Sequence, residues 1–138
     1  MKRLLYAVWL ACSTLPGCLM EDDQNEPAPL SRDSYPGALV VDWTLGGVAD
    51  ADECDRGDAT WLVTTVFTSS GRRIGEFHDD CGAFSTSIEL DPGGYYAEAV
   101  LEDASGNART TPVTIGDFRI LGKDTLAVSV DFPARSFY

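Results

Sequence analysis

Apolar and polar residues alternate in short runs from Gly37 onward. Leu39, Val41, Trp43 and Leu45 are each separated by a single residue, and a period of two places all four on one face of a β-strand. Similar runs recur every 8 to 14 residues or so, a spacing typical of β-sandwiches. They lie within 60–69, 72–77, 84–90, 95–102, 113–118 and 126–132. The sequence predicts an all-β fold, an antiparallel β-sandwich of about seven strands, with a small closed barrel as the competing architecture.

One turn supports the sandwich. The segment Leu90-Asp91-Pro92-Gly93-Gly94-Tyr95 resembles the L-x-P-G-x-Y turn of immunoglobulin-like and transthyretin-like sandwiches, including carboxypeptidase regulatory-like domains. The resemblance implies that Tyr95 packs inward and hydrogen-bonds back to the turn, as in a tyrosine corner. It implies a fold and no particular activity.

The first residues have the layout of an export signal. Lys2 and Arg3 precede an apolar run, Leu4 to Leu10, that is too short to span a bilayer of about 30 Å. The segment Leu15-Pro16-Gly17-Cys18 then resembles the bacterial lipobox, which implies cleavage before Cys18 and lipidation of its thiol. Cys12 fits less well because Trp9 occupies the aliphatic position. The alternative is an ordinary cleaved signal that leaves Cys18 as a spare thiol.

The predicted organisation has three parts: a helical lipoprotein signal peptide over 1–17, the lipidated Cys18 with a flexible acidic linker to residue 36, and a β-sandwich domain over 37–138. Leu19 follows Cys18 where an inner-membrane retention signal would have Asp, so the resemblance implies outer-membrane delivery. With this tether and domain, the chain looks like the small lipoproteins of myxobacteria-like proteomes. The predicted partners are a lipid bilayer and an envelope protein.

Two cysteines remain for the domain. Cys54 and Cys81 would pair in an oxidising compartment, and closing a loop of about 27 residues stabilises the fold by about 3 kcal/mol in the chain-entropy model. A zinc site is a weaker interpretation, because His78 is the single histidine in the chain.

The charge excludes one class of partner. Cleavage before Cys18 removes two of the ten basic residues and none of the 22 acidic ones, which leaves a formal charge of about −14. Such a chain is unsuited to nucleic acids and to anionic membranes, and it suits cations or a basic partner. A simply solvated acidic surface is the alternative.

Five carboxylates crowd residues 50–58. Asp50, Asp52, Asp55 and Asp58 could converge on Ca²⁺, which takes six to eight oxygen ligands. The glycine and distal glutamate of an EF-hand loop are misplaced, however, and like charges so close together repel. A solvated loop fixed by Cys54 is the alternative to a calcium site, and no other cofactor is expected.

Catalytic and sugar-binding signals are weak. Glu76 and His78 could form an acid–base pair, but no G-x-S-x-G or H-E-x-x-H motif accompanies them, so a polar strand end is the simpler interpretation. Trp43 and Trp61 suit core packing better than a sugar-binding face, and Tyr96 is the better candidate for an exposed aromatic. The aromatic residues weighed for such a face are Trp43, Trp61, Tyr95 and Tyr96.

The predicted function follows from these parts. We expect a membrane-anchored cell-envelope lipoprotein, on the periplasmic side or at the cell surface, with a non-catalytic structural or adaptor role. A Ca²⁺- or glycan-binding module is the first alternative. A hydrolytic enzyme is the second, for which the sequence supplies no catalytic set.

Overall fold

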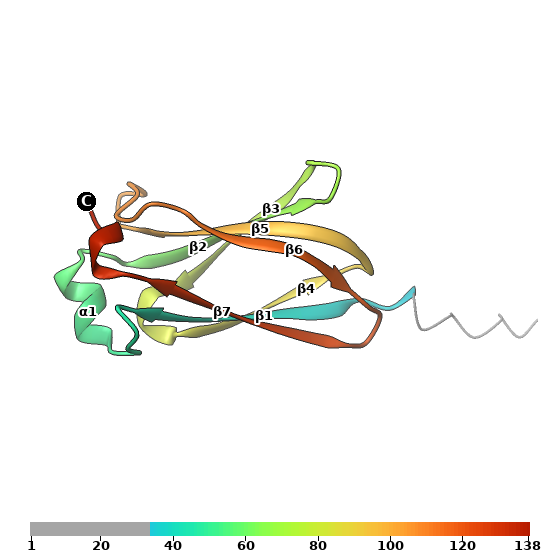
Figure 1. The fold of residues 1–138 in the computed structure, drawn as a ribbon, viewed down its shortest axis with the longest axis horizontal. Coiled ribbons are helices and arrows are strands. Elements are labelled where there is room, and N and C mark those ends of the chain that lie inside the picture. Colours follow the sequence, from blue (N-terminus) through green and yellow to red (C-terminus); the bar gives the residue numbers. More distant parts are fainter. Residues whose placement is uncertain (1–33) are drawn as a thin grey trace, which may run out of the picture.

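Seven strands form two packed sheets, as predicted from the alternation. The computed structural model describes residues 34–138, so the predicted signal peptide, Cys18 and most of the linker lie outside the described residues (Figure 1). The elements, in chain order, are β1 (Gly37–Leu45), α1 (Ala51–Arg56), β2 (Trp61–Thr68), β3 (Arg73–Asp80), the 3₁₀ turn η2 (Cys81–Ala83), β4 (Ser85–Leu90), β5 (Gly93–Glu102), β6 (Val113–Ile120), β7 (Thr125–Phe132) and the 3₁₀ turn η3 (Ala134–Ser136).

One strand pair departs from the antiparallel prediction. The sheets have the orders β4-β1-β7 and β3-β2-β5-β6, and β1 runs parallel to β7, with Leu39 opposite Leu126 and Trp43 opposite Val130. The other paired strands are antiparallel. An alternation of period two is the same for both pairings, so the sequence could not distinguish them.

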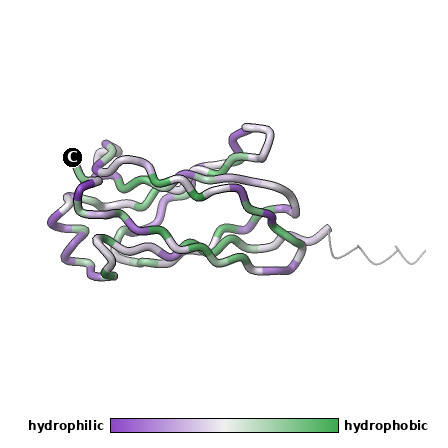
Figure 2. Tube along the Cα trace, viewed as in Figure 1, coloured by the Kyte–Doolittle hydropathy of each residue, from purple (hydrophilic) through white to green (hydrophobic). Residues whose placement is uncertain are grey.

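The core lies between the two sheets. On β1, the side chains at 39, 41, 43 and 45 are all at most 3 % exposed, and they face the β2 and β5 side chains that complete the main cluster. The buried residues of β2 and β5 in this cluster are Leu62, Val66, Tyr95, Ala97, Ala99 and Leu101. Figure 2 shows the resulting alternation of hydrophobic and hydrophilic residues along the strands, and the hydrophilic character of α1.

The acidic segment after β1 contains a helix, which corrects the expectation of an irregular loop. The carboxylate of Asp50 caps α1 by accepting a hydrogen bond of 3.0 Å from the backbone N–H of Asp52. Cys54 is the buried residue of this six-residue helix. A helix this short buries too few positions to produce a recognisable helical period, because two turns of apolar spacing are needed.

The disulfide between Cys54 and Cys81 is confirmed, with Cα atoms 6.1 Å apart. It joins α1 to η2 at one end of the sandwich, rather than bridging the two sheets across the core. At one of the two cysteines, the indole Nε1 of Trp43 donates a hydrogen bond of 2.9 Å to the backbone carbonyl of Cys81. The disulfide and Trp43 together fix the position of α1 against β1.

The predicted tyrosine corner is also confirmed. Tyr95 is 6 % exposed, and its hydroxyl donates a hydrogen bond of 2.7 Å to the carbonyl of Asp91. This turn lies at the end of the sandwich where the chain enters at Gly37, whereas α1 and the C-terminal segment lie at the opposite end (Figure 1). Among residues 34–138, no helix is long and apolar enough to cross a membrane.

Candidate functional site

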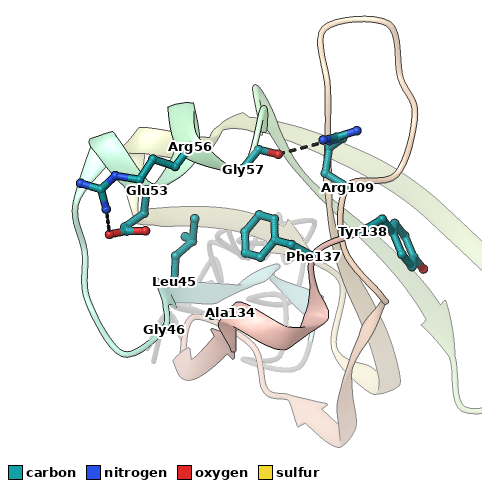
Figure 3. Close-up of a pocket in the computed structure, with 9 residues that line it drawn as sticks. All are labelled: Leu45, Gly46, Glu53, Arg56, Gly57, Arg109, Ala134, Phe137 and Tyr138. Carbon is teal, nitrogen blue, oxygen red and sulfur yellow. Dashed lines mark hydrogen bonds and ion pairs between the residues drawn. The ribbon is translucent and has the colours of Figure 1, made fainter.

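A pocket of about 260 Å³ opens at the α1 end of the sandwich (Figure 3). Leu45 and Phe137 point into it, Glu53 and Arg56 lie on one side, and Arg109 lies on the other. The full lining is Leu45, Gly46, Glu53, Arg56, Gly57, Arg109, Ala134, Phe137 and Tyr138. The pocket is assembled from the end of β1, α1, the segment before β6 and the C-terminal segment.

The C-terminal segment forms one wall because it pairs with the chain before β6. Thr110 and Phe137 form an isolated antiparallel bridge, and the backbone N–H of Tyr138 donates 3.0 Å to the carbonyl of Arg109. Phe137 packs directly against Gly57, where a Cβ atom would lie 2.2 Å from the phenyl ring. Glycine at 57 is therefore required by the close approach of the ring, and its φ of −84° is unstrained.

The rim of the pocket carries charged side chains, and most of them pair with one another or with a neighbouring group. Arg109 donates from Nε to the carbonyl of Gly57 at 3.2 Å, and the same nitrogen lies 3.9 Å from the carboxylate of Asp58. Arg56 forms an ion pair with Glu53. These pairs are solvent-exposed and contribute little to stability. The pocket thus has an apolar floor beneath charged side chains that pair with one another, an arrangement that could hold a ligand by shape and hydrogen bonding. Its lining residues include no histidine, cysteine or serine for nucleophilic chemistry.

The structure does not assemble the predicted calcium ligands. Asp50 is engaged in capping, Asp52 and Asp55 belong to the helix, and Asp58 follows it beside Arg109. Within residues 34–138, no group of three or more His, Cys, Asp or Glu side chains is placed to hold a metal ion. The cap holds Asp50 at one end of the helix and Asp58 lies beside Arg109 after the other end, so the four carboxylates do not converge.

Glu76 and His78 do meet, on the exposed edge strand β3. The imidazole Nε2 of His78 lies 2.9 Å from Glu76, and Arg73 forms an ion pair with the same carboxylate. The hydrogen bond from His78, followed by the charge of Arg73, holds the pKa of Glu76 below its ordinary value. Both side chains are well exposed, so the cluster lacks the enclosure that acid–base catalysis uses.

The four aromatic residues weighed for a sugar-binding face fall on different surfaces. Trp43 and Tyr95 are buried in the core, whereas Trp61 is 38 % exposed. Core packing is thus correct for Trp43 and wrong for Trp61. Tyr96 is half-buried because its ring stacks on Phe67, with centroids 4.9 Å apart. The sequence analysis missed Phe67, although the two-residue period from Trp61 places it on the same face.

A second pocket, of about 490 Å³, lies at the opposite end of the domain beside the Tyr95 turn. Pro36, Arg72 and Ile74 are among its lining residues, together with the 89–95 segment. Pro36 places this pocket beside the point where the chain enters the sandwich.

A comparison with protein-family models finds no match to this chain, and a comparison with curated proteins finds none either. We therefore base the proposed function on the residues of this chain and their contacts.

Proposed function

We propose that this chain is a lipid-anchored protein of the bacterial cell envelope whose β-sandwich acts as a non-catalytic adaptor. The anchor is the lipobox-like Leu15-Pro16-Gly17-Cys18 after a short export signal, with acylation on Cys18. Leu19 in the next position favours the outer membrane. The adaptor is the disulfide-linked sandwich, whose Cys54–Cys81 bond suits an oxidising compartment.

The observation that carries this proposal is the placement of the two ends of β1. The chain enters the sandwich at Gly37, and β1 then runs about 26 Å to Leu45, at about 3.3 Å per residue. Leu45 lines the α1-end pocket, whereas Pro36 lines the pocket at the opposite end. An anchor upstream of Gly37 would therefore be attached at the end of the sandwich opposite α1, which leaves α1 and its pocket accessible to partners in the envelope.

Replacing the cysteine tests the anchor. The Cys18→Ser variant should move from the membrane fraction to the soluble fraction, because several acyl chains hold a protein on a bilayer and no acyl chain would remain. Cys12→Ser is the matched control and should stay with the membranes. A Cys18→Ser protein that remains membrane-bound contradicts the proposal. Sucrose-gradient separation of inner and outer membranes then tests the proposed outer-membrane location of the native chain.

A further inference from the structure

The outer face of the four-stranded sheet carries an apolar stripe that the core does not use. Leu62 and Val66 point inward, so Trp61, Val63 and Phe67 project from the opposite side of β2. The register pairs Val63 with Val100 and Phe67 with Tyr96 on β5. We call these five residues, Trp61, Val63, Phe67, Tyr96 and Val100, the aromatic face.

The aromatic face is ordered by its own contacts. The rings of Phe67 and Tyr96 stack with an interplanar angle of 10°. Val63 is 2 % exposed although it lies outside the core cluster, between His78 and Val100 in the register. From Trp61 to Phe67 the stripe extends about 20 Å along β2. Trp61 is the well-exposed member, at 38 %, and the polar Thr65 separates the Trp61–Val63 end of the stripe from the Phe67–Tyr96 end. An exposed aromatic side chain that the core does not use is a candidate contact for a partner protein.

Acidic side chains flank the stripe on both neighbouring strands. Trp61 is paired with Asp80 on β3 and with Glu102 on β5. Two residues after Val63 on β2, Thr65 is paired with Glu76 on β3 and with Glu98 on β5. Each of these acids is paired in register with a β2 residue that points outward, so all four border the aromatic face. Asp80 also accepts a hydrogen bond of 2.8 Å from the N–H of Gly82, which leaves its second carboxylate oxygen for a partner. Arg73, which pairs with Glu76, is the neighbouring cation at the Phe67 end.

This arrangement specifies the charge of the occupant. An exposed indole attracts a cation over its ring, and carboxylates on either side strengthen that attraction. The formal charge of the whole chain, −12, would also draw a basic partner toward the domain from a distance. A second copy of the chain would bring like charges together across the same surface. A neutral glycan would use the rings but gain little from the flanking charges.

We propose that the aromatic face binds a basic segment of a partner protein, with a lysine or arginine side chain over Trp61 between Asp80 and Glu102. This inference rests on the adaptor role and names the chemistry of its partner. Apolar side chains of the same segment would lie along the half-buried Val100 toward the Phe67–Tyr96 pair.

Binding to the purified full-length protein in detergent tests the proposal. The probe is an amidated twelve-residue peptide of alternating lysine and glycine, and a glutamate–glycine peptide is its control. The double variant Glu98→Gln, Glu102→Gln and the variant Trp61→Thr should each weaken binding at least about fivefold. The matched control is Asp42→Asn, Glu89→Gln, which removes two charges from β1 and β4 of the other sheet, and its affinity should stay within about twofold.

Three results would overturn the proposal. If the test double variant and the control double variant weaken peptide binding equally, the peptide is attracted by the negative charge of the whole protein. A neutral hexasaccharide that binds in place of the peptide, and is lost in Trp61→Thr, would identify a glycan face. A dimer in sedimentation experiments that Trp61→Thr dissociates would identify a self-association face. If Trp61→Thr does not fold, the double variant Glu98→Gln, Glu102→Gln decides the outcome.

The two proposals can fail separately. Peptide binding to the Cys18→Ser protein should equal that of the native chain, because Cys18 lies outside the domain that carries the aromatic face. If Cys18 proves not to be lipidated but the protein still binds the peptide, the proposed partner chemistry stands. If Cys18 is lipidated but the protein does not bind the peptide, the proposed anchor stands.

Discussion

The hydroxyl of Tyr95 donates a hydrogen bond of 2.7 Å to the backbone carbonyl of Asp91, four residues earlier in the chain. This bond closes the turn between β4 and β5, and therefore connects the two sheets of the sandwich. Burial of the phenol, followed by the nearby charge of Asp91, raises the pKa of Tyr95 above its ordinary value. Burial of the ring and the charge of Asp91 thus both favour the protonated hydroxyl that donates this bond.

Tyr95→Phe should lower the free energy of unfolding by about 1 kcal/mol, the usual net value of one intramolecular hydrogen bond. Urea denaturation should show a lower midpoint with an unchanged slope. Tyr96→Phe is the control: its ring stacks on Phe67, and the effect should stay within about 0.5 kcal/mol. Equal effects at the two positions would contradict the account of the corner.

Thr64→Val should stabilise the protein by about 1 kcal/mol. The side chain is fully buried, and within the described part of the chain its hydroxyl oxygen has no hydrogen-bond partner. Thr110→Val provides the opposite case, because the buried Thr110 hydroxyl accepts a bond of 3.0 Å from the N–H of Leu101. That variant should lose about 1 to 3 kcal/mol. Thermal melting of both proteins measures the difference in sign, and a destabilised Thr64→Val would refute the assignment.

Gly57→Ala should destabilise the domain by about 1 to 3 kcal/mol, because the added methyl group meets the Phe137 ring. Gly116→Ala, where a Cβ atom would have nothing within 4 Å, is the matched control. Combining Gly57→Ala with Phe137→Ala should cost less than the sum of the two single changes. Additive costs would show that the ring does not contact Gly57 in solution.

The loop after β5 should show a pH effect centred on Asp103. Its carboxylate accepts hydrogen bonds from the side chain and the N–H of Asn107 and from the N–H of Ser105, and these hold its pKa below the ordinary value. A lowered pKa means that the ionised form contributes stability above the ordinary aspartate pKa, and that this contribution is lost as the pH falls through the lowered value.

Asn107→Ala should therefore raise the pKa of Asp103 toward its ordinary value, as followed by carboxyl NMR titration. The difference in melting temperature between Asn107→Ala and the native chain should be largest near neutral pH and should shrink as the pH falls below the ordinary aspartate pKa. A pKa that does not move would show that the loop does not hold Asn107 against Asp103.

Two features were predictable because each depends on local pattern. The period of two along Leu39 to Leu45 reports which side of the strand is buried, and a Pro-Gly turn before Tyr95 reports a corner. The Cys54–Cys81 pair follows from counting the cysteines that lie in the predicted sandwich domain.

Other features depend on contacts that no local pattern carries. The parallel pairing of β1 with β7 joins the first and the last strand of the domain. The helix α1 is stabilised by one cap and one disulfide. The sequence predicts a core position for Trp61 because the residue sits in a strand of alternating apolar residues. Which face of such a strand is covered depends on the neighbouring sheet, and only the fold shows that Trp61 lies outside.

The most direct test of the account is mass spectrometry of the N-terminal peptide from protein extracted from native membranes. The account predicts a peptide that begins at Cys18 and carries a diacylglycerol on its thiol. A mature chain with an unmodified Cys18 thiol, or one that begins elsewhere, would contradict the lipid anchor on which the proposed orientation of the sandwich depends.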